Sequence, residues 1–133
     1  MEININRVLY KDMINQKVLV VDDEVAIQKL TKRFLEKFGN KVDVANNGLE
    51  GYNLYKENEY MCVISDSDMP IMTGSEMYHK IKQYDSKANF IFITGNANNL
   101  GKKIKNETIY QKPVSFNTYK EINHKIQEKL LYQ

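Results

Sequence analysis

The chain has 133 residues, which is the usual size of a single domain and is long enough to bury one core. Its 19 basic and 17 acidic side chains leave a net charge of +2, which gives little support for a nucleic-acid partner. No apolar run approaches the ~20 residues of a membrane-spanning helix, residues 1–7 lack the long apolar stretch of a secretion signal, and Cys62 has no disulfide partner. We therefore expect a cytoplasmic protein without membrane contact.

From residue 17 onward, short apolar runs alternate with segments of helical period, which predicts βα units and a parallel sheet. The first predicted helix follows Asp23 and ends at Gly39-Asn40, a stop that allows a positive φ. Its apolar positions recur at three- and four-residue steps and are Ile27, Leu30, Phe34, Leu35 and Phe38.

A strand at 42–45 and a turn at 46–48 come next. The apolar positions that should face inward on the following helix are Leu49, Tyr52 and Tyr55. The third strand, 61–64, has no polar alternation, as expected for a central strand that is covered on both faces. Cys62 lies in this strand and is interpreted as a core residue.

After a loop at 70–74, a third helix is marked by Met77, Ile81 and Tyr84. The fourth strand, 90–93, is followed by a segment poor in helix formers, 96–101, so a fourth helix should be short. Ser115 is the expected N-cap of the last helix. The apolar stripe of that helix consists of Phe116, Tyr119, Ile122, Ile126 and Leu130.

Residues 1–16 match neither periodicity and are compatible with a linker, a pairing arm or an extra helix. We therefore divide the chain into an N-terminal extension or linker, 1–16, and one domain, 17–133. Because the last helix ends almost at the chain terminus, we expect no output domain to follow it.

Polar side chains stand where four of the predicted strands end. They are Asp22 and Asp23 after the first strand, Asp66 and Asp68 after the third, Thr94 after the fourth and Lys112 after the fifth. Ligands of open parallel sheets bind at this edge, so we expect these groups to form one phosphate site.

Several negative charges in a small volume repel one another, by up to ~4 kcal/mol for a close pair at a surface-like dielectric. Such a site requires a cation, and oxygen ligands near a phosphate favour Mg²⁺ or Mn²⁺. Zinc is not expected, because His79 and His124 are not in a ligand-spaced cluster and are interpreted as surface residues.

A carboxylate beside a metal can act as a nucleophile and form an aspartyl phosphate, and Asp66 is the candidate here. Lys112 can supply a fixed ammonium, Thr94 a hydroxyl donor and Ser67 a backbone amide. Taken separately, these residues have ordinary structural interpretations. Asp23, for example, is equally suited to cap the next helix.

In combination, the motifs resemble the receiver domain of the response-regulator family, the phosphoacceptor half of two-component signalling. The resemblance runs from about residue 17 to 131. The pieces that carry it, in family order, are Val20-Val21-Asp22-Asp23-Glu24, Asp66-Ser67-Asp68-Met69-Pro70 with Gly74, Thr94-Gly95 and Lys112-Pro113.

The resemblance implies an α/β fold, a (βα)₅ flavodoxin-like doubly wound sandwich with a five-stranded parallel sheet. It implies that Asp66 takes a phosphoryl group from a phosphohistidine on a sensor histidine kinase or a histidine phosphotransfer protein. The implied Mg²⁺ ligands are Asp22, Asp23, Asp66 and the backbone carbonyl of Asp68. Thr94 and Lys112 would contact the phosphoryl group, and the changed surface of the fourth helix, fifth strand and last helix would signal to a downstream protein.

The sequence departs from the family pattern at three points. The switch aromatic usually lies three residues before the lysine, where this chain has Ile109; Tyr110 would point to the opposite strand face unless a bulge intervenes. The interval from Thr94 to Lys112 is a few residues short. Asp68 adds a carboxylate that could either repel or orient the water that removes the phosphoryl group.

Two other functions compete with a phosphorylated signalling module. Asp66-Ser67-Asp68 is similar to the nucleophile motif of haloacid-dehalogenase-like phosphohydrolases, although that family has the reverse motif order. A phosphorylation-independent interaction domain is the other alternative, if the altered switch position uncouples the surface. Within the leading hypothesis, a stand-alone regulator, a phosphorelay intermediate and a receiver from a hybrid kinase all remain open.

Overall fold

The computed structural model describes residues 17–131, and side chains as far as residue 129. The predicted extension at 1–16 and the side chain of Leu130 lie outside the described residues. The elements are β1 (Lys17–Val21), α2 (Val25–Lys37), β2 (Lys41–Ala45), α3 (Gly48–Glu57), β3 (Cys62–Ser65), α4 (Gly74–Tyr84), β4 (Phe90–Thr94), α5 (Ala97–Lys103), β5 (Thr108–Gln111) and α6 (Phe116–Leu131). These elements confirm the predicted alternation of strands and helices.

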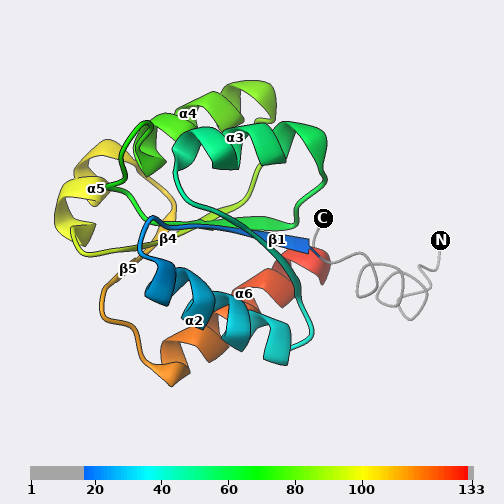
Figure 1. The fold of residues 1–133 in the computed structure, drawn as a ribbon. Helices are drawn as coiled ribbons and strands as arrows, with labels where there is room; N and C mark the ends of the chain where they lie inside the picture. The colour runs from blue at the N-terminus through cyan, green and yellow to red at the C-terminus, as the bar shows by residue number, and fades with distance from the viewer. Residues whose placement is uncertain (1–16, 132–133) are drawn as a thin grey trace.

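The five strands form one parallel sheet in the order β2-β1-β3-β4-β5 (Figure 1). The order reverses between β1 and β3, so the loops after these two strands leave toward opposite faces of the sheet. This is the predicted (βα)₅ flavodoxin-like topology, and the crevice at such a reversal is where open α/β sheets bind ligands.

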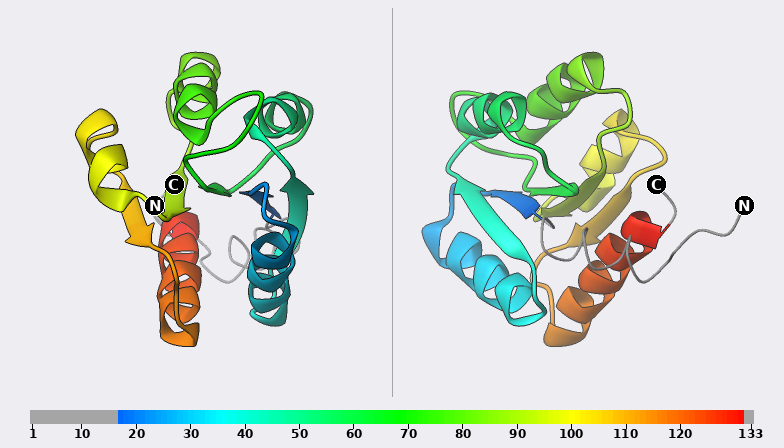
Figure 2. Two further views of the ribbon diagram at one scale, coloured as in Figure 1. Left: turned by 60° about the vertical axis from the view of Figure 1, so that its left-hand side comes forward. Right: turned by 90° about the vertical axis from the view of Figure 1, so that its right-hand side faces the viewer.

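Helices cover both faces of the sheet (Figures 1 and 2). Leu19 and Val21 of β1 point into one core, with residues of α3, α4 and α5, whereas Val18 and Val20 point into the other, with residues of α2 and α6. Because both faces are covered, the inner strands are apolar without alternation, and Cys62 is buried as expected.

The N-terminus of α2 does not use Asp23 as its cap, which is the alternative structural interpretation of this residue. The residue that caps this helix is Glu24, not Asp23, and its side chain makes no capping hydrogen bond. Instead, the Asp22 carboxylate accepts the backbone N–H of Glu24 at 2.9 Å. Asp23 is left exposed, with its carboxylate free of a capping role. At the other end the helix ends at Lys37, and Gly39 follows two residues later with a φ of 99°, in agreement with the predicted stop.

On α3, Tyr55 faces the core, but the prediction for Leu49 is wrong, because this side chain is 41% exposed. The buried positions are Gly48, Gly51 and Tyr55. A Cβ on Gly51 would come within 2.6 Å of Met77 Sδ and 2.9 Å of Val21 Cγ2, so α3 packs through a glycine face rather than an apolar stripe. This close packing turns Leu49 outward.

The other helices follow the sequence pattern except at three apolar positions that are exposed, Leu30 of α2 (42%), Phe116 of α6 (47%) and Tyr84 of α4. α5 has seven residues and is as short as predicted. The Ser115 hydroxyl accepts the Thr118 N–H at 3.2 Å, in agreement with its capping role at α6. Tyr84 ends α4 but is 58% exposed, so it does not belong to the buried stripe of that helix. None of the helices in the described range, 17–131, is long and apolar enough to cross a membrane.

Gly74 fixes the loop that follows β3. Its N–H donates to the Ser67 carbonyl at 2.9 Å, and a Cβ at this position would lie 1.9 Å from the Asp66 carbonyl oxygen. The clash is with backbone, so it cannot be relieved by a side-chain rotation. The start of α4 therefore holds the Asp66–Ser67 segment directly.

We expect Gly74→Ala to lower the free energy of unfolding by about 2 kcal/mol or more, because the chain must shift away from Asp66. Gly101→Ala is the matched control: a Cβ on Gly101 meets nothing within 4 Å, and alanine favours the helix. Urea unfolding of the three proteins measures both effects. Equal stability of Gly74→Ala and the parent would contradict this account of the loop.

Candidate functional site

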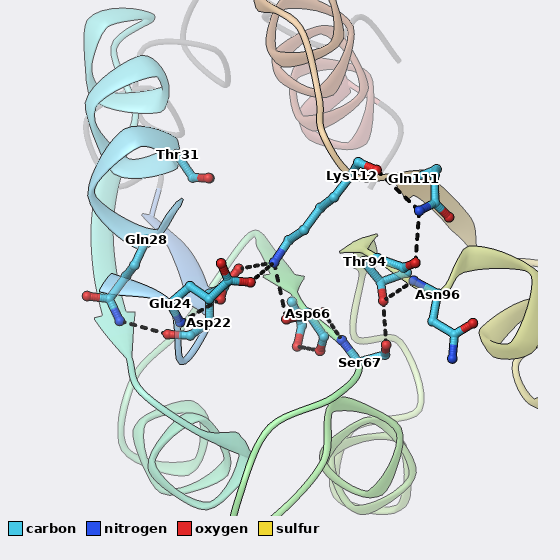
Figure 3. Close-up of polar contacts among 12 residues, drawn as sticks. Asp22, Glu24, Gln28, Thr31, Asp66, Ser67, Thr94, Asn96, Gln111 and Lys112 are labelled. Atoms are coloured by element: carbon cyan, nitrogen blue, oxygen red, sulfur yellow. Dashed lines mark hydrogen bonds and ion pairs between the residues drawn. The ribbon is translucent and has the colours of Figure 1, made fainter. Parts of the chain in front are cut away.

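Backbone hydrogen bonds extend the sheet one residue beyond β1, β3 and β5. The N–H of Asp22 donates to Ala45, that of Asp66 to Val21 and that of Lys112 to Thr94, at 3.1, 3.0 and 2.8 Å. The polar residues after these strands are thereby held at one edge of the sheet, as the sequence predicts. Figure 3 shows the Asp22, Asp66, Ser67, Thr94 and Lys112 side chains around one site.

Three carboxylates meet at this edge. One oxygen each from Asp22, Asp23 and Asp66 lies within 4.8 Å of the others, so together they could hold a metal ion. Asp22 and Asp66 are 4% and 7% exposed, whereas Asp23 is exposed. Buried carboxylates at this separation repel one another strongly unless a cation lies between them. An all-oxygen, partly open cluster suits Mg²⁺ or Mn²⁺.

Lys112 supplies one positive charge to the cluster. Its Nζ lies 3.0 Å from Asp22 Oδ2, 3.2 Å from Asp66 Oδ2 and 3.2 Å from Glu24 Oε1. The ammonium has three N–H donors, so it can satisfy all three acceptors at once. Lys112 therefore links the strand that precedes it, β5, to the loops after β1 and β3.

Burial and neighbouring charges shift the pKa values of Asp22 and Lys112. Burial raises the pKa of the Asp22 carboxyl, and the bonds from Glu24 and Lys112 offset this only in part. For Lys112, burial alone would lower the pKa. The hydrogen bonds and negative charges of Asp22 and Asp66 outweigh this effect, so the pKa of Lys112 is raised above its ordinary value. The ammonium is therefore well stabilised in its charged form by the carboxylates that share it.

Thr94 and Ser67 form a second polar group beside the carboxylates. Thr94 Oγ1 lies 2.5 Å from Ser67 Oγ and accepts the N–H of Asn96 at 3.1 Å. The N–H of Ser67 donates to Asp66 Oδ1 at 2.7 Å. Thr94 is thus placed near Asp66, and the predicted Ser67 amide already contacts the carboxylate.

The Asp68 side chain lies apart from the three clustered carboxylates. It is exposed and lines a cavity of about 50 Å³ between the loop after β3 and α5. The other lining residues are Ser67, Thr73, Ser75, Asn96, Asn99, Leu100 and Lys103. Asp68 therefore adds charge next to the site rather than inside it.

Sequence reasoning missed two side chains that shape the loop after β1. Gln28 is buried, and its Nε2 lies within 3.1 Å of the carbonyl oxygens of Asp22 and Ala45 and of Asn46 Oδ1. Glu24 reaches Lys112 from the first residue before α2. No sequence pattern marks a helical glutamine as the anchor of a loop. Glu24 could have been found, because it directly follows the acidic pair Asp22-Asp23.

The two candidate switch residues on β5 face opposite sides of the sheet. Ile109 packs against the core under α4 and α5, and Tyr110 packs against the core under α6. The register from Ile91–Thr108 to Thr94–Gln111 is continuous, so no bulge reverses these directions. Burial, with the charge of Glu121 nearby, raises the pKa of Tyr110 to about 12.

Residues 18–124 match the family model described as the response regulator receiver domain. This chain belongs to the response-regulator receiver family. The Staphylococcus aureus transcriptional regulatory protein SrrA is 36% identical over 70 residues, which are 53% of this chain and 29% of SrrA. The chain thus covers less than a third of this curated relative. A receiver domain is the signalling phosphoacceptor module of two-component systems.

Solved receiver structures agree with the fold. A receiver domain protein from Clostridium thermocellum is 32% identical, with a TM-score of 0.73 over 89% of this chain and 99% of that one. TrrA from Thermotoga maritima, solved in complex with Mg²⁺ and BeF, is 30% identical, with a TM-score of 0.74 over 84% of this chain and 98% of that one. A CheY-like receiver from Methanospirillum hungatei has a TM-score of 0.78 at 25% identity, over 89% of this chain and 98% of that one.

We expect Mg²⁺ to stabilise this receiver domain, since a cation relieves the repulsion among the clustered carboxylates. At ten times its dissociation constant the gain is about 1.4 kcal/mol. The gain should be lost in Asp22→Asn and kept in Asp68→Asn, which preserves the backbone carbonyl. Thermal unfolding with MgCl₂, against NaCl at equal ionic strength, measures the difference. An equal Mg²⁺ response of parent and Asp22→Asn would contradict the assignment.

Proposed function

We propose that Asp66 is the phosphoacceptor of this receiver domain and takes its phosphoryl group from a phosphohistidine on a sensor histidine kinase or histidine phosphotransfer protein. The observation that carries the proposal is the Asp66 carboxylate itself. It is nearly buried, yet it lies beside two other acids, one ammonium and a backbone N–H. A buried acid with this set of partners is arranged for chemistry rather than for packing.

The residues around Asp66 have complementary roles in this proposal. Side chains of Asp22, Asp23 and Asp66, with the Asp68 backbone carbonyl, would hold Mg²⁺ or Mn²⁺, which neutralises phosphoryl oxygens when bound. The TrrA structure, which contains Mg²⁺ and BeF, supports this set by its similarity. Lys112 and Thr94 bind the remaining phosphoryl oxygens, and the Ser67 N–H moves from the carboxylate to the phosphoryl group.

In the transfer step, an Asp66 carboxylate oxygen attacks phosphorus and the P–N bond to the donor imidazole breaks. The nitrogen keeps the electron pair of that bond, and the donor ring, already protonated on its other nitrogen, leaves as neutral imidazole. Lys112 already contacts Asp66, and its ammonium also stabilises the negative charge of the phosphoryl oxygens once they are bonded to Asp66. The signal is lost by hydrolysis, in which water attacks phosphorus and the P–O bond to Asp66 breaks. The domain therefore assists its own phosphorylation and dephosphorylation without being a turnover enzyme for free substrates.

Exposure to acetyl phosphate and Mg²⁺ should add one phosphoryl group to the parent and none to Asp66→Asn. The bond should be stable to acid and labile to base. Intact-mass measurement gives the stoichiometry, and Asp68→Asn is the control, since its carboxylate stands outside the cluster. Equal labelling of parent and Asp66→Asn would refute the proposal. Sustained hydrolysis of a small phosphate ester would instead favour the phosphohydrolase alternative.

The signal leaves through a protein contact at the surface of α5, β5 and α6. Ile109 is the residue of β5 that faces α5, so we assign the switch position to Ile109 and treat Tyr110 as a core residue under α6. Residues 1–16 are proposed as an extension or linker outside the receiver domain.

Beryllofluoride with Mg²⁺ should change the amide NMR signals of α5 and β5, because Thr94 and Lys112 both adjoin them. Ile109→Ala should reduce these changes by at least half, since it removes the side chain between β5 and α5. Tyr110→Phe, on the opposite face, should leave them intact and serves as the control. Unchanged α5 and β5 signals in the parent would favour a phosphorylation-independent interaction domain.

A further inference from the structure

The Thr94 hydroxyl is enclosed by two fixed neighbours. Thr94 is fully buried, and Ser67 is 5% exposed. The Asn96 N–H donates to Thr94 Oγ1 at 3.1 Å, and Ser67 Oγ lies on another side of the same oxygen at 2.5 Å (Figure 3). Ser67 also donates its backbone N–H to Asp66 Oδ1. One residue therefore contacts both the acceptor carboxylate and the hydroxyl that is to bind its phosphoryl group.

A hydroxyl group has one proton and two acceptor sites. On Thr94, the Asn96 N–H occupies one acceptor site, so the proton and the second site remain for Ser67 and the phosphoryl group. If Thr94 donates to Ser67, only its second lone pair is left for the phosphoryl oxygens, which are themselves acceptors. If Ser67 donates to Thr94, the Thr94 proton is free to be donated to a phosphoryl oxygen. Only in the second arrangement does the Thr94 hydroxyl form a hydrogen bond with a phosphoryl oxygen.

We propose that Ser67 is a positioning residue for phosphorylation: its hydroxyl donates to Thr94 and thereby directs the Thr94 proton toward the phosphoryl oxygen on Asp66. This inference rests on the proposed function and adds a side-chain role to a residue otherwise used through its backbone. The two arrangements of the Ser67–Thr94 pair differ only in the positions of two protons. The negative phosphoryl group selects the productive one, since a hydrogen bond to a charged acceptor is stronger than one to a neutral hydroxyl.

A purely structural role for the pair predicts different behaviour. Two buried hydroxyls that satisfy each other stabilise the fold, and removal of one would lower stability without changing the phosphorylation rate of the folded protein. The positioning role instead requires Thr94. Its effect must disappear when the Thr94 hydroxyl is absent, which makes a double-mutant cycle decisive.

The experiment measures the rate of phosphorylation by acetyl phosphate with saturating Mg²⁺, from intact mass against time, on the full chain. Ser67→Ala should be slower than the parent by about threefold to tenfold, the range expected for loss of one neutral hydrogen bond. Ser67→Thr keeps the hydroxyl, and Ser67 borders a cavity of about 50 Å³, so this variant should restore most of the rate. Thr94→Ala and the double variant Ser67→Ala/Thr94→Ala should react at equal rates.

Urea unfolding of each variant shows that the folded protein is being compared. An unchanged rate in Ser67→Ala would overturn the inference, even if its stability falls. So would a rate loss of the same size in the Thr94→Ala background, because Ser67 would then act without Thr94. Stoichiometric labelling of the parent at Asp66 in the same experiment keeps the proposed function standing in either case, whereas unlabelled parent protein would end both proposals.

Discussion

The ion pairs of Lys112 are the interaction on which the site depends. Folding brings the buried acids Asp22 and Asp66 together at the carboxyl edge of the sheet, and no packing arrangement can remove their repulsion. The ammonium of Lys112 lies within 3.2 Å of both and of Glu24, so it offsets the repulsion where it is greatest. Without it, the central strands would end in uncompensated buried charge.

This compensation is incomplete, and the incompleteness gives the site its chemistry. One ammonium faces the carboxylates of Asp22, Asp66 and Glu24, with Asp23 beside them, so negative charge remains in excess. In the proposed function, a divalent cation would add the missing positive charge, and a phosphoryl group would then replace the carboxylates as the partner of Lys112. A fully neutralised cluster would be more stable but would have no affinity for either group.

Much of the fold and of the site could be predicted from the sequence, because both follow from where apolar runs stop. Parallel strands place their carboxyl ends at one edge, so Asp22, Asp66, Thr94 and Lys112 had to meet once the βα pattern was recognised. Strict alternation likewise predicted the opposite directions of Ile109 and Tyr110, which the continuous register of β5 confirms. These inferences need only periodicity and topology.

The features that the sequence left unpredicted depend on contacts between distant segments. Leu49 occupies an apolar helical position, but the glycine face of α3 packs on Val21 and Met77 and turns Leu49 outward. Asp23 suits a helix cap, yet Asp22 takes the N–H of Glu24 and the cap moves one residue on. The hydrogen bond of the Ser67 hydroxyl could not be predicted from the sequence either, because its partner Thr94 lies 27 residues away, at the end of β4.

Lys112 also joins the site to the signalling surface proposed for α5, β5 and α6. Its neighbour Gln111 accepts the N–H of Ala97, at the start of α5, and donates to the Gly95 carbonyl after β4. Thr94 lies immediately before this loop and accepts the N–H of Asn96 within it. A charge that draws Lys112 and Thr94 toward Asp66 therefore acts on both ends of one short hydrogen-bonded segment. Because α5 has only seven residues, the hydrogen-bonded segment before it contributes much of what fixes the position of the helix. A displacement at the phosphoryl site therefore has to pass through only one loop to reach α5.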